Sequence, residues 1–160
     1  MSENRVGMGW DVHAFADDRP LVLGGVTIEH DRGLAGHSDA DVLLHAITDA
    51  LLGAAGFGDI GEHFPDDDPR FKGAASTDLL REVVFRVSEE GWRVVNADCT
   101  VVAQEPRLMP RKPWIRRSIA ALLGVSEDRV NVKAKTAEHM GPVGRREAIE
   151  AQAVVLLERF

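Results

Sequence analysis

A second cysteine is missing from this sequence of 160 residues, which rules out an intrachain disulfide. The single cysteine, Cys99, lies in the stretch VVNADCTVVA, whose apolar residues alternate. Alternation of this kind predicts a strand that buries Cys99 on the same face as Val95, Ala97 and Val101. We therefore expect a core thiol rather than a catalytic one, in a protein of a reducing compartment.

Long apolar runs and an excess of basic residues are missing too. No apolar run approaches the ~18 residues of a transmembrane helix, and residues 1–5 are polar, so neither a membrane span nor a signal peptide is predicted. Lysine and arginine number 19 against 26 aspartates and glutamates, which leaves a formal net charge of −7. Binding to the phosphates of nucleic acids or anionic membranes needs clustered positive charge. We expect neither partner, a cytoplasmic location, and a local device wherever the protein binds phosphate.

The periodic segments predict one α+β domain over residues 1–160, a length that suits a single domain. Apolar alternation predicts strands and helical spacing predicts helices, which together form a mixed sheet with helices packed on one face. The predicted strands are 5–15, 92–103, 130–136 and 149–157, and the predicted helices are 39–55, 76–90 and 110–123. For residues 149–157 the apolar alternation favours a strand, although helical spacing is not excluded.

Turn and cap signals divide these elements. Gly24 and Gly25 predict a small hairpin over residues 21–28. Ser38 or Asp39 is available to cap the first helix, and Ser76 to cap the second. Residues 56–73 are rich in glycine, proline and aspartate and predict a loop, in which one helical turn can fit. Long loops in small domains are often functional.

The first strand carries a possible metal site. Asp11 and His13 are two residues apart, so their side chains project from the same face. His45 on the first helix is a third candidate ligand, and Asp41 and Asp49, four residues to either side, are candidates to orient its ring. Three protein ligands with an open fourth position are typical of catalytic zinc. The alternative is a solvated strand face beside a helix histidine paired with Asp41 or Asp49.

The start of the first helix is a possible phosphate site. His37 and Ser38 lie where a helix N-terminus offers unpaired N–H groups to an anion. Asp39 and Asp41 would repel a phosphate there unless a cation intervened, so a phosphate site and a metal site support each other. Otherwise Ser38 is only a cap.

The loop after this helix contains four aspartates, at positions 59, 66, 67 and 68. Their spacing lacks the calcium pattern of an EF-hand, and the acidic run 66–68 can equally be a solvated loop. Asp59 is flanked by glycines, where the backbone lets a ligand approach and a carboxylate accepts from sugar hydroxyls.

The segment VNVKAKTAEHMGPVGRRE is the last candidate. Lys133 and Lys135 share a strand face, which is a solvated face by default. Glu138 follows the strand and is a candidate to hold Mg²⁺ or Mn²⁺ together with substrate phosphates.

Four segments in order resemble the family of 2-C-methyl-D-erythritol 2,4-cyclodiphosphate synthases, enzymes of the non-mevalonate isoprenoid pathway. They are GWDVHAF, GGVTIEHDRGLAGHSDADVLLHAITDALLGAAGFGDIGEHFPDDDPRFKGA, VVNADCTVVAQEPRL and VNVKAKTAEHMGPVGRREAI, and they span nearly the whole chain. The resemblance implies a phosphorus-oxygen lyase. It converts 4-diphosphocytidyl-2-C-methyl-D-erythritol 2-phosphate to the 2,4-cyclodiphosphate by attack of the 2-phosphate on the β-phosphorus, with release of CMP.

The resemblance also implies roles for individual residues. Zinc is expected on Asp11, His13 and His45, and Mg²⁺ or Mn²⁺ on Glu138 with the substrate diphosphate. Contacts with the 2-phosphate and the methylerythritol are implied for His37, Ser38, Asp59 and Gly61, and for Asp66, Asp68 and Lys72 of a flexible loop. The implied cytidine-phosphate pocket consists of Ala103, Pro106, Arg107, Leu108, Met109, Ala134, Lys135 and Thr136. His37 and Thr136 count among the implied catalytic residues.

The resemblance further implies a homotrimer around a central cavity, with each active site shared between neighbouring subunits. Trp10 and Arg145 match positions near the mouth of the cavity, where an isoprenoid diphosphate is a possible ligand. The sequence departs from the family pattern at Ala137, His139, Arg146 and Ala148. Ala137 bears on nucleotide affinity, and Arg146 and Ala148 bear on the cavity ligand.

Two other functions fit the same residues. One is a trimeric binding module without turnover, against which the complete set of candidate metal ligands argues. The other is a zinc phosphohydrolase, which needs a carboxylate or imidazole base beside the open zinc position.

Overall fold

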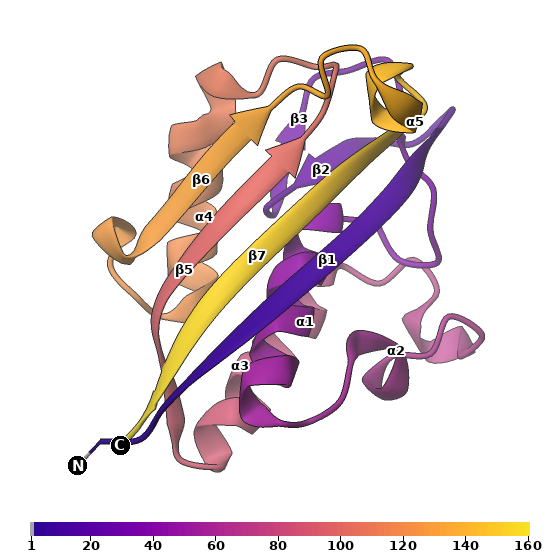
Figure 1. Ribbon diagram of the computed structural model, residues 1–160. Helices are drawn as coiled ribbons and strands as arrows, with labels where there is room; N and C mark the ends of the chain where they lie inside the picture. Colours follow the sequence, from indigo (N-terminus) through magenta and orange to yellow (C-terminus); the bar gives the residue numbers. More distant parts are fainter. Residues whose placement is uncertain (1) are drawn as a thin grey trace.

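The computed structural model describes residues 2–160 and has helices packed against a five-stranded sheet (Figure 1). The strands are β1 (Asn4–Ala16), β2 (Leu21–Leu23), β3 (Val26–Ile28), β4 (Gly33–Leu34), β5 (Trp92–Val102), β6 (Val130–Lys135) and β7 (Ala148–Arg159). The α-helices are α1 (Val42–Ala55), α2 (Ile60–His63), α3 (Ser76–Glu89), α4 (Lys112–Leu123) and α5 (Gly141–Gly144). Single 3-10 turns are η1 (Pro69–Phe71), η2 (Met109–Arg111) and η3 (Glu127–Arg129).

The sheet is mixed, and its strand order is β4-β1-β7-β5-β6. β1 and β5 pair antiparallel with β7, whereas β5 and β6 run parallel. The predicted α+β class with a mixed sheet is therefore confirmed, as is the strand at residues 149–157. The two-residue strand β4 at the edge was not predicted.

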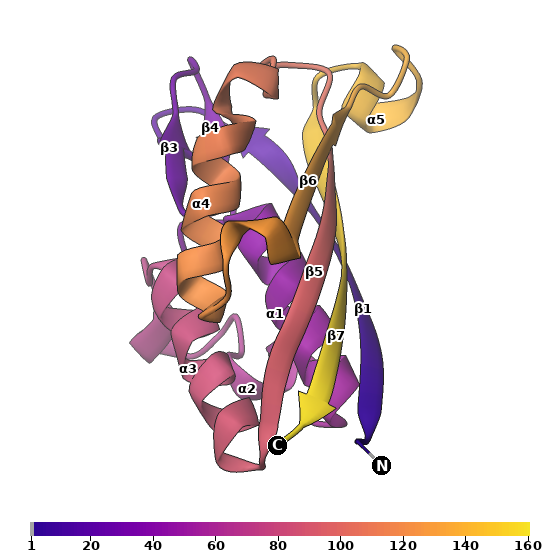
Figure 2. The same cartoon turned by 90° about the vertical axis from the view of Figure 1, so that its left-hand side faces the viewer.

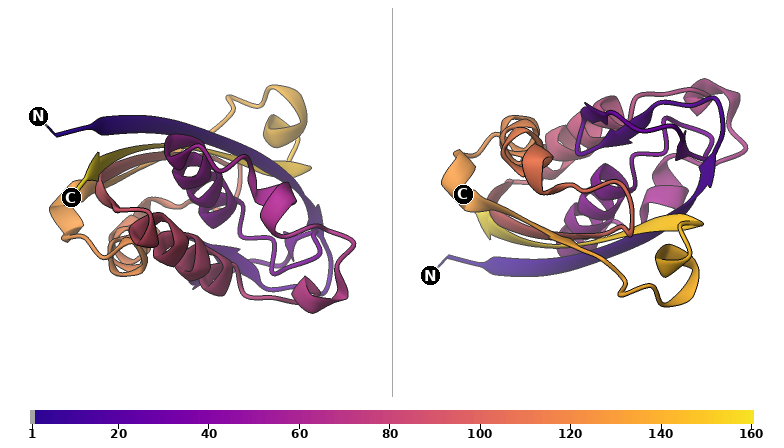
Figure 3. Two further views of the ribbon diagram at one scale, coloured as in Figure 1. Left: turned by 90° about the horizontal axis from the view of Figure 1, so that it is seen from below. Right: turned by 90° about the horizontal axis from the view of Figure 1, so that it is seen from above.

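Helices α1, α3 and α4 all cover one face of this sheet, as predicted (Figures 2 and 3). The one-turn helix α5 lies beyond one end of the strands, toward the other face. In the described part of the chain, no helix packs on that other face along β1 and β7 (Figures 2 and 3). This bare face exposes the apolar side chains of Val6, Met8, Trp10, Val12 and Val154. Within residues 2–160, no helix combines the length and the apolar character needed to cross a membrane.

Two glycines bring α1 unusually close to β1. A β-carbon on Gly7 would lie 1.9 Å from the carbonyl oxygen of Ala50, and one on Gly9 would lie 1.8 Å from that of Ala46. Any side chain at either position would therefore push the helix off the strand. Because the odd-numbered residues of β1 share one face, the same face next presents Asp11 and His13 to the helix.

The cap of α1 differs from the prediction. The helix begins at Val42, and its cap is Asp41, not Ser38 or Asp39. The Asp41 carboxylate is fully buried and accepts from the N–H of Leu44 at 3.0 Å. It also accepts from Gly24 at 2.9 Å and Gly25 at 2.7 Å, the two positive-φ residues of the predicted β2–β3 hairpin. Asp41 therefore ties the hairpin to the start of the helix.

Three further details correct the predictions. Ser76 is the first residue of α3 rather than its cap, which is Ala75. The α-helix predicted from Pro110 begins at Lys112, because residues 109–111 form a 3-10 turn. A β-bulge between Val94 and Asn96 interrupts the predicted alternation, so Val94 rather than Val95 pairs with Leu157 and packs against the core. Cys99 itself is buried in the core, as predicted.

Candidate metal centre and neighbouring pockets

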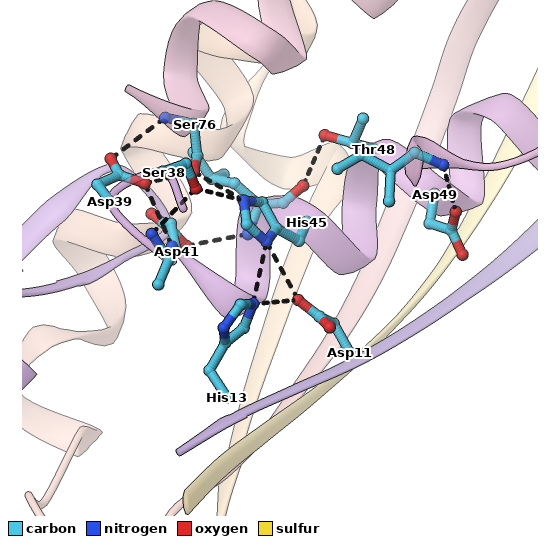
Figure 4. Close-up of polar contacts among 12 residues, drawn as sticks. Asp11, His13, Ser38, Asp39, Asp41, His45, Thr48, Asp49 and Ser76 are labelled. Carbon is cyan, nitrogen blue, oxygen red and sulfur yellow. Dashed lines mark hydrogen bonds and ion pairs between the residues drawn. The ribbon is translucent and has the colours of Figure 1, made fainter. Parts of the chain in front are cut away.

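The side chains of Asp11 and His13 on β1 converge with that of the third candidate, His45 on α1 (Figure 4). Oδ2 of Asp11 lies 2.8 Å from Nε2 of His13 and 3.1 Å from Nδ1 of His45. The two ring nitrogens are 3.2 Å apart. All three side chains are partly buried, so the alternative of a solvated strand face is wrong.

The electrostatics of the cluster favour an ionised carboxylate. Burial alone would raise the pKa of Asp11, but the adjacent imidazoles of His13 and His45 outweigh it and lower that pKa to about 2. Burial alone would lower the pKa of His13, but its contact with Asp11 raises it. The cluster is thus a negative charge held between two imidazoles.

This donor set fits a divalent transition metal. One carboxylate oxygen and two imidazole nitrogens all lie within 4.8 Å of one another, and no other such group occurs among the described residues. Zinc takes this combination of ligands. The remaining nitrogen of His13, Nδ1, lies 2.6 Å from the carbonyl oxygen of Ala35, which orients the ring as is usual for a metal-ligating histidine.

The partners of His45 are not the predicted ones. Asp41 caps α1 instead, and Asp49 accepts from the N–H of Ile60 at 3.0 Å. Nε2 of His45 lies 2.9 Å from Oγ of Ser76 and 3.2 Å from that of Ser38. The sequence contains no local signal for Ser76, because it lies 31 residues from His45 and reaches the ring only when α3 packs on α1.

The cluster opens into a pocket of about 240 Å³. The pocket wall includes apolar residues of the 56–73 loop and α3. Seven predicted site residues line it: Asp11, His13, His37, Ser38, His45, Gly61 and Asp66. Asp59, Asp68 and Lys72 are not part of this lining.

The residues of the 56–73 loop are held by local bonds. The loop contains two helical turns where one was expected: α2, which Asp59 caps by accepting from Glu62 at 3.0 Å, and the 3-10 turn η1. The Asp68 carboxylate bonds to Arg70, whose guanidinium lowers the pKa of Asp68. The backbone oxygen of Asp68 lies 2.9 Å from Nε2 of His37, which joins the loop to the start of α1. Lys72 is exposed.

A second pocket lies at the ends of β5 and β6 and has a volume of about 180 Å³. Gln104 and all eight residues of the implied cytidine-phosphate pocket line it: Ala103, Pro106, Arg107, Leu108, Met109, Ala134, Lys135 and Thr136. Gln104 was missed. The two pockets share no residue, and β7 separates β5 from β1, a distance of roughly 10 Å across the sheet.

The segment between β6 and β7 carries Glu138 apart from the Asp-His-His cluster. Glu138 is exposed and has a φ of 52°, with its N–H donating to Oγ1 of Thr136 at 3.2 Å. Arg145 forms an ion pair with Glu147 at 3.1 Å. Arg146, where the sequence departs from the family pattern, has a φ of 63° that favours glycine.

The fold and the pocket define the class of protein: an α+β protein whose pocket wall carries an Asp-His-His cluster of the kind that can hold a metal ion. Comparison with known proteins gives the family. The model of the YgbB family matches residues 4–158. The 2-C-methyl-D-erythritol 2,4-cyclodiphosphate synthase of Bordetella avium (strain 197N) is 62% identical over 155 residues, which are 97% of this chain and 96% of that protein. The chain therefore belongs to the YgbB family of 2-C-methyl-D-erythritol 2,4-cyclodiphosphate synthases, which confirms the resemblance, and it is an enzyme.

Solved structures agree. The bifunctional IspDF of Campylobacter jejuni has a TM-score of 0.96 at 46% identity, and the match covers 100% of this chain and 43% of that one. A 2C-methyl-D-erythritol-2,4-cyclodiphosphate synthase in a CDP-bound form has a TM-score of 0.88 at 38% identity, covering 96% of this chain and 99% of that one.

Proposed function

We propose that this chain converts 4-diphosphocytidyl-2-C-methyl-D-erythritol 2-phosphate to 2-C-methyl-D-erythritol 2,4-cyclodiphosphate and CMP in a metal-dependent intramolecular phosphoryl transfer. The observation that carries the proposal is the convergence of Asp11, His13 and His45 in a pocket that also contains His37 and Ser38. Family membership supports the same reaction.

Zinc is the metal that we propose for this cluster. Oδ2 of Asp11, Nε2 of His13 and Nδ1 of His45 would hold it, since the other nitrogen of each ring already faces an oxygen atom. When bound, zinc neutralises charge on a substrate phosphate and leaves one coordination position for it. The bound cation would thereby give an acidic protein the local positive charge that it needs to bind a polyanionic substrate.

His37 and Ser38 contact the 2-phosphate in this proposal, because they lie in the pocket wall beside the cluster. Gly61 and Asp66 line the same pocket and face the methylerythritol. On the same loop, Asp59 contacts the methylerythritol hydroxyls in this proposal, and Asp68 and Lys72 approach the same substrate. Because both ends of one flexible molecule are held, the reacting phosphates meet at a high effective concentration, which lowers the barrier by several kcal/mol.

The second pocket binds the cytidine phosphate, and the CDP complex of the relative supports a cytidine nucleotide as ligand. Glu138 holds Mg²⁺ or Mn²⁺ with the substrate diphosphate, next to Thr136. The left-handed backbone of Glu138 supports this role, since strained residues cluster at functional sites. Neutralisation by two cations is a common way to promote phosphoryl transfer.

We assign the protein a homotrimeric state in which the pocket at the cluster of one subunit faces the second pocket of its neighbour. The separation of the two pockets within one chain supports this arrangement. So does the bare face of β1 and β7, because a contiguous exposed apolar surface marks an interface. Trp10, on this face, would lie near the mouth of the central cavity with Arg145, where an isoprenoid diphosphate could bind.

Incubation of the metal-loaded protein with the cytidine substrate tests the reaction. Cyclodiphosphate and CMP in equal amounts are expected, whereas an acyclic product would indicate a phosphohydrolase and no product a binding module. His45→Ala should remove turnover and zinc retention together. Glu138→Gln should reduce turnover in a way that raised Mg²⁺ or Mn²⁺ restores, and full activity in metal-stripped buffer would contradict the proposal.

A further inference from the structure

The hydroxyl of Ser76 lies between the Asp39 carboxylate and the ring of His45 (Figure 4). Ser76 is only 1% exposed. Its Oγ donates to Oδ1 of Asp39, and its backbone N–H donates to Oδ2 at 3.2 Å. On the other side, Oγ is 2.9 Å from Nε2 of His45. The geometry therefore links a carboxylate, a hydroxyl and an imidazole in one chain of contacts.

Counting protons assigns a direction to each contact. A serine hydroxyl has one proton and two lone pairs, whereas an ionised carboxylate only accepts. The Ser76 proton consequently points to Asp39, and Oγ can only accept from His45. This requires the proton of the neutral ring to be on Nε2, which leaves the lone pair of Nδ1 directed toward Asp11 and His13.

From this geometry we infer that Ser76, oriented by Asp39, is a positioning residue that holds His45 in the tautomer able to bind a metal through Nδ1. The inference rests on the metal site of the proposed function. Without such a device, Oδ2 of Asp11, 3.1 Å from Nδ1, would attract the ring proton to that nitrogen.

Ser38 does not replace Ser76 in this role. Its Oγ lies 3.2 Å from the same Nε2 and accepts from the N–H of Ala40 at 3.1 Å. The Ser38 proton remains available to Nε2, so this hydroxyl suits either tautomer. Only Ser76 must accept from Nε2 of His45, because its own proton is donated to the Asp39 carboxylate.

Zinc affinity, measured by competition with a chromophoric chelator, tests the inference. Ser76→Ala should weaken zinc binding by about 10–100-fold, the usual effect of losing a group that orients a metal ligand. Ser76→Thr keeps the hydroxyl and should restore affinity to near that of the unaltered protein. Thr48→Val is the matched control, because Thr48 is also 1% exposed on α1 but donates to the carbonyl of Leu44, and it should leave affinity unchanged.

A double-mutant cycle separates the effect of the Asp39–Ser76–His45 contacts, here called the relay, from a general structural effect. Asp39→Asn should also weaken zinc binding, and combined with Ser76→Ala it should bind no more weakly than Ser76→Ala alone, because Asp39 acts through Ser76. Asp39→Asn keeps the Ser76 side chain in place, so it tests the Asp39–Ser76–His45 contacts even if Ser76→Ala does not fold. If the double variant lost the full sum of the zinc-binding free energies lost by the two single variants, the inference would be overturned.

His45→Ala distinguishes a failure of the proposed metal site from a failure of the contacts through Ser76. If it abolishes zinc binding while Ser76→Ala and Asp39→Asn bind like the unaltered protein, the relay is wrong and the metal site stands. If His45→Ala binds zinc normally, the metal site itself is wrong and the relay fails with it. Thermal unfolding of each metal-free variant should show midpoints close to one another.

Discussion

Gly9→Ala should disrupt the proposed metal centre without altering any of its candidate ligands. Gly9 lies two residues before Asp11 on the face of β1 that contacts α1. An added β-carbon would lie 1.8 Å from the carbonyl oxygen of Ala46, the residue next to His45, where ordinary contact begins at 3.4 Å. The obstacle is backbone, so no side-chain rotation relieves it.

The size of the effect follows from this overlap. The deficit is about 1.6 Å (3.4 Å less 1.8 Å), and α1 must move away from β1 by a similar amount. Overpacking of a core costs typically 1–3 kcal/mol, and we expect the upper end, about 3 kcal/mol of unfolding free energy. Metal–ligand distances tolerate only about 0.2 Å, so the displaced His45 is lost as a ligand and zinc affinity falls by at least ~10-fold.

Urea unfolding and zinc competition measure the two effects, and α1 offers a control. Gly53 lies within α1, and a β-carbon there meets nothing within 4 Å. Gly53→Ala should therefore raise stability by about 0.5–1 kcal/mol, because alanine is the better helix former, and leave zinc affinity unchanged. If Gly9→Ala kept both stability and zinc affinity, the close approach of α1 to β1 would not be what positions His45.

Three other expectations concern separate parts of the molecule. Asp41→Asn should lower the unfolding free energy in urea by about 1–3 kcal/mol, because the amide nitrogen that replaces Oδ2 cannot accept from the N–H of Gly25. An unchanged midpoint would refute the role of this cap. Burial raises the pKa of Cys99 to about 12 from 9.0, so its thiolate fraction at pH 8 should fall about a thousandfold and Ellman's reagent should react only after unfolding; rapid reaction in the native state would show the strand to be open. Met8→Glu places a charge on the bare sheet face, where Met8 is 56% exposed, and should turn a trimer into monomers in sedimentation velocity while the monomer stays folded. A trimer that persists would place the interface elsewhere.

Most of the fold follows from local periodicity. Alternating apolar residues predicted the long strands, and helical spacing predicted α1, α3 and α4 to within a few residues. The errors arise where a tertiary contact decides a local choice. Ser76 is not a cap because its hydroxyl bonds to Asp39, and Asp41 caps α1 while it also holds the hairpin. The bulge at Val95 depends on pairing with β7, a strand more than 50 residues away.

For the candidate site, too, the sequence determined one part and the tertiary structure another. The residue types and spacings alone determined that Asp11 and His13 share a strand face and that His45 is a candidate third ligand, since the period of a strand is a local property. Only the tertiary structure decided that these groups meet, because the meeting depends on two glycines that let a helix contact a strand. It also decided that His45 is oriented by hydroxyls of residues 38 and 76 rather than by its neighbours on α1, because packing between α1 and α3 has no signature in the spacing of either helix.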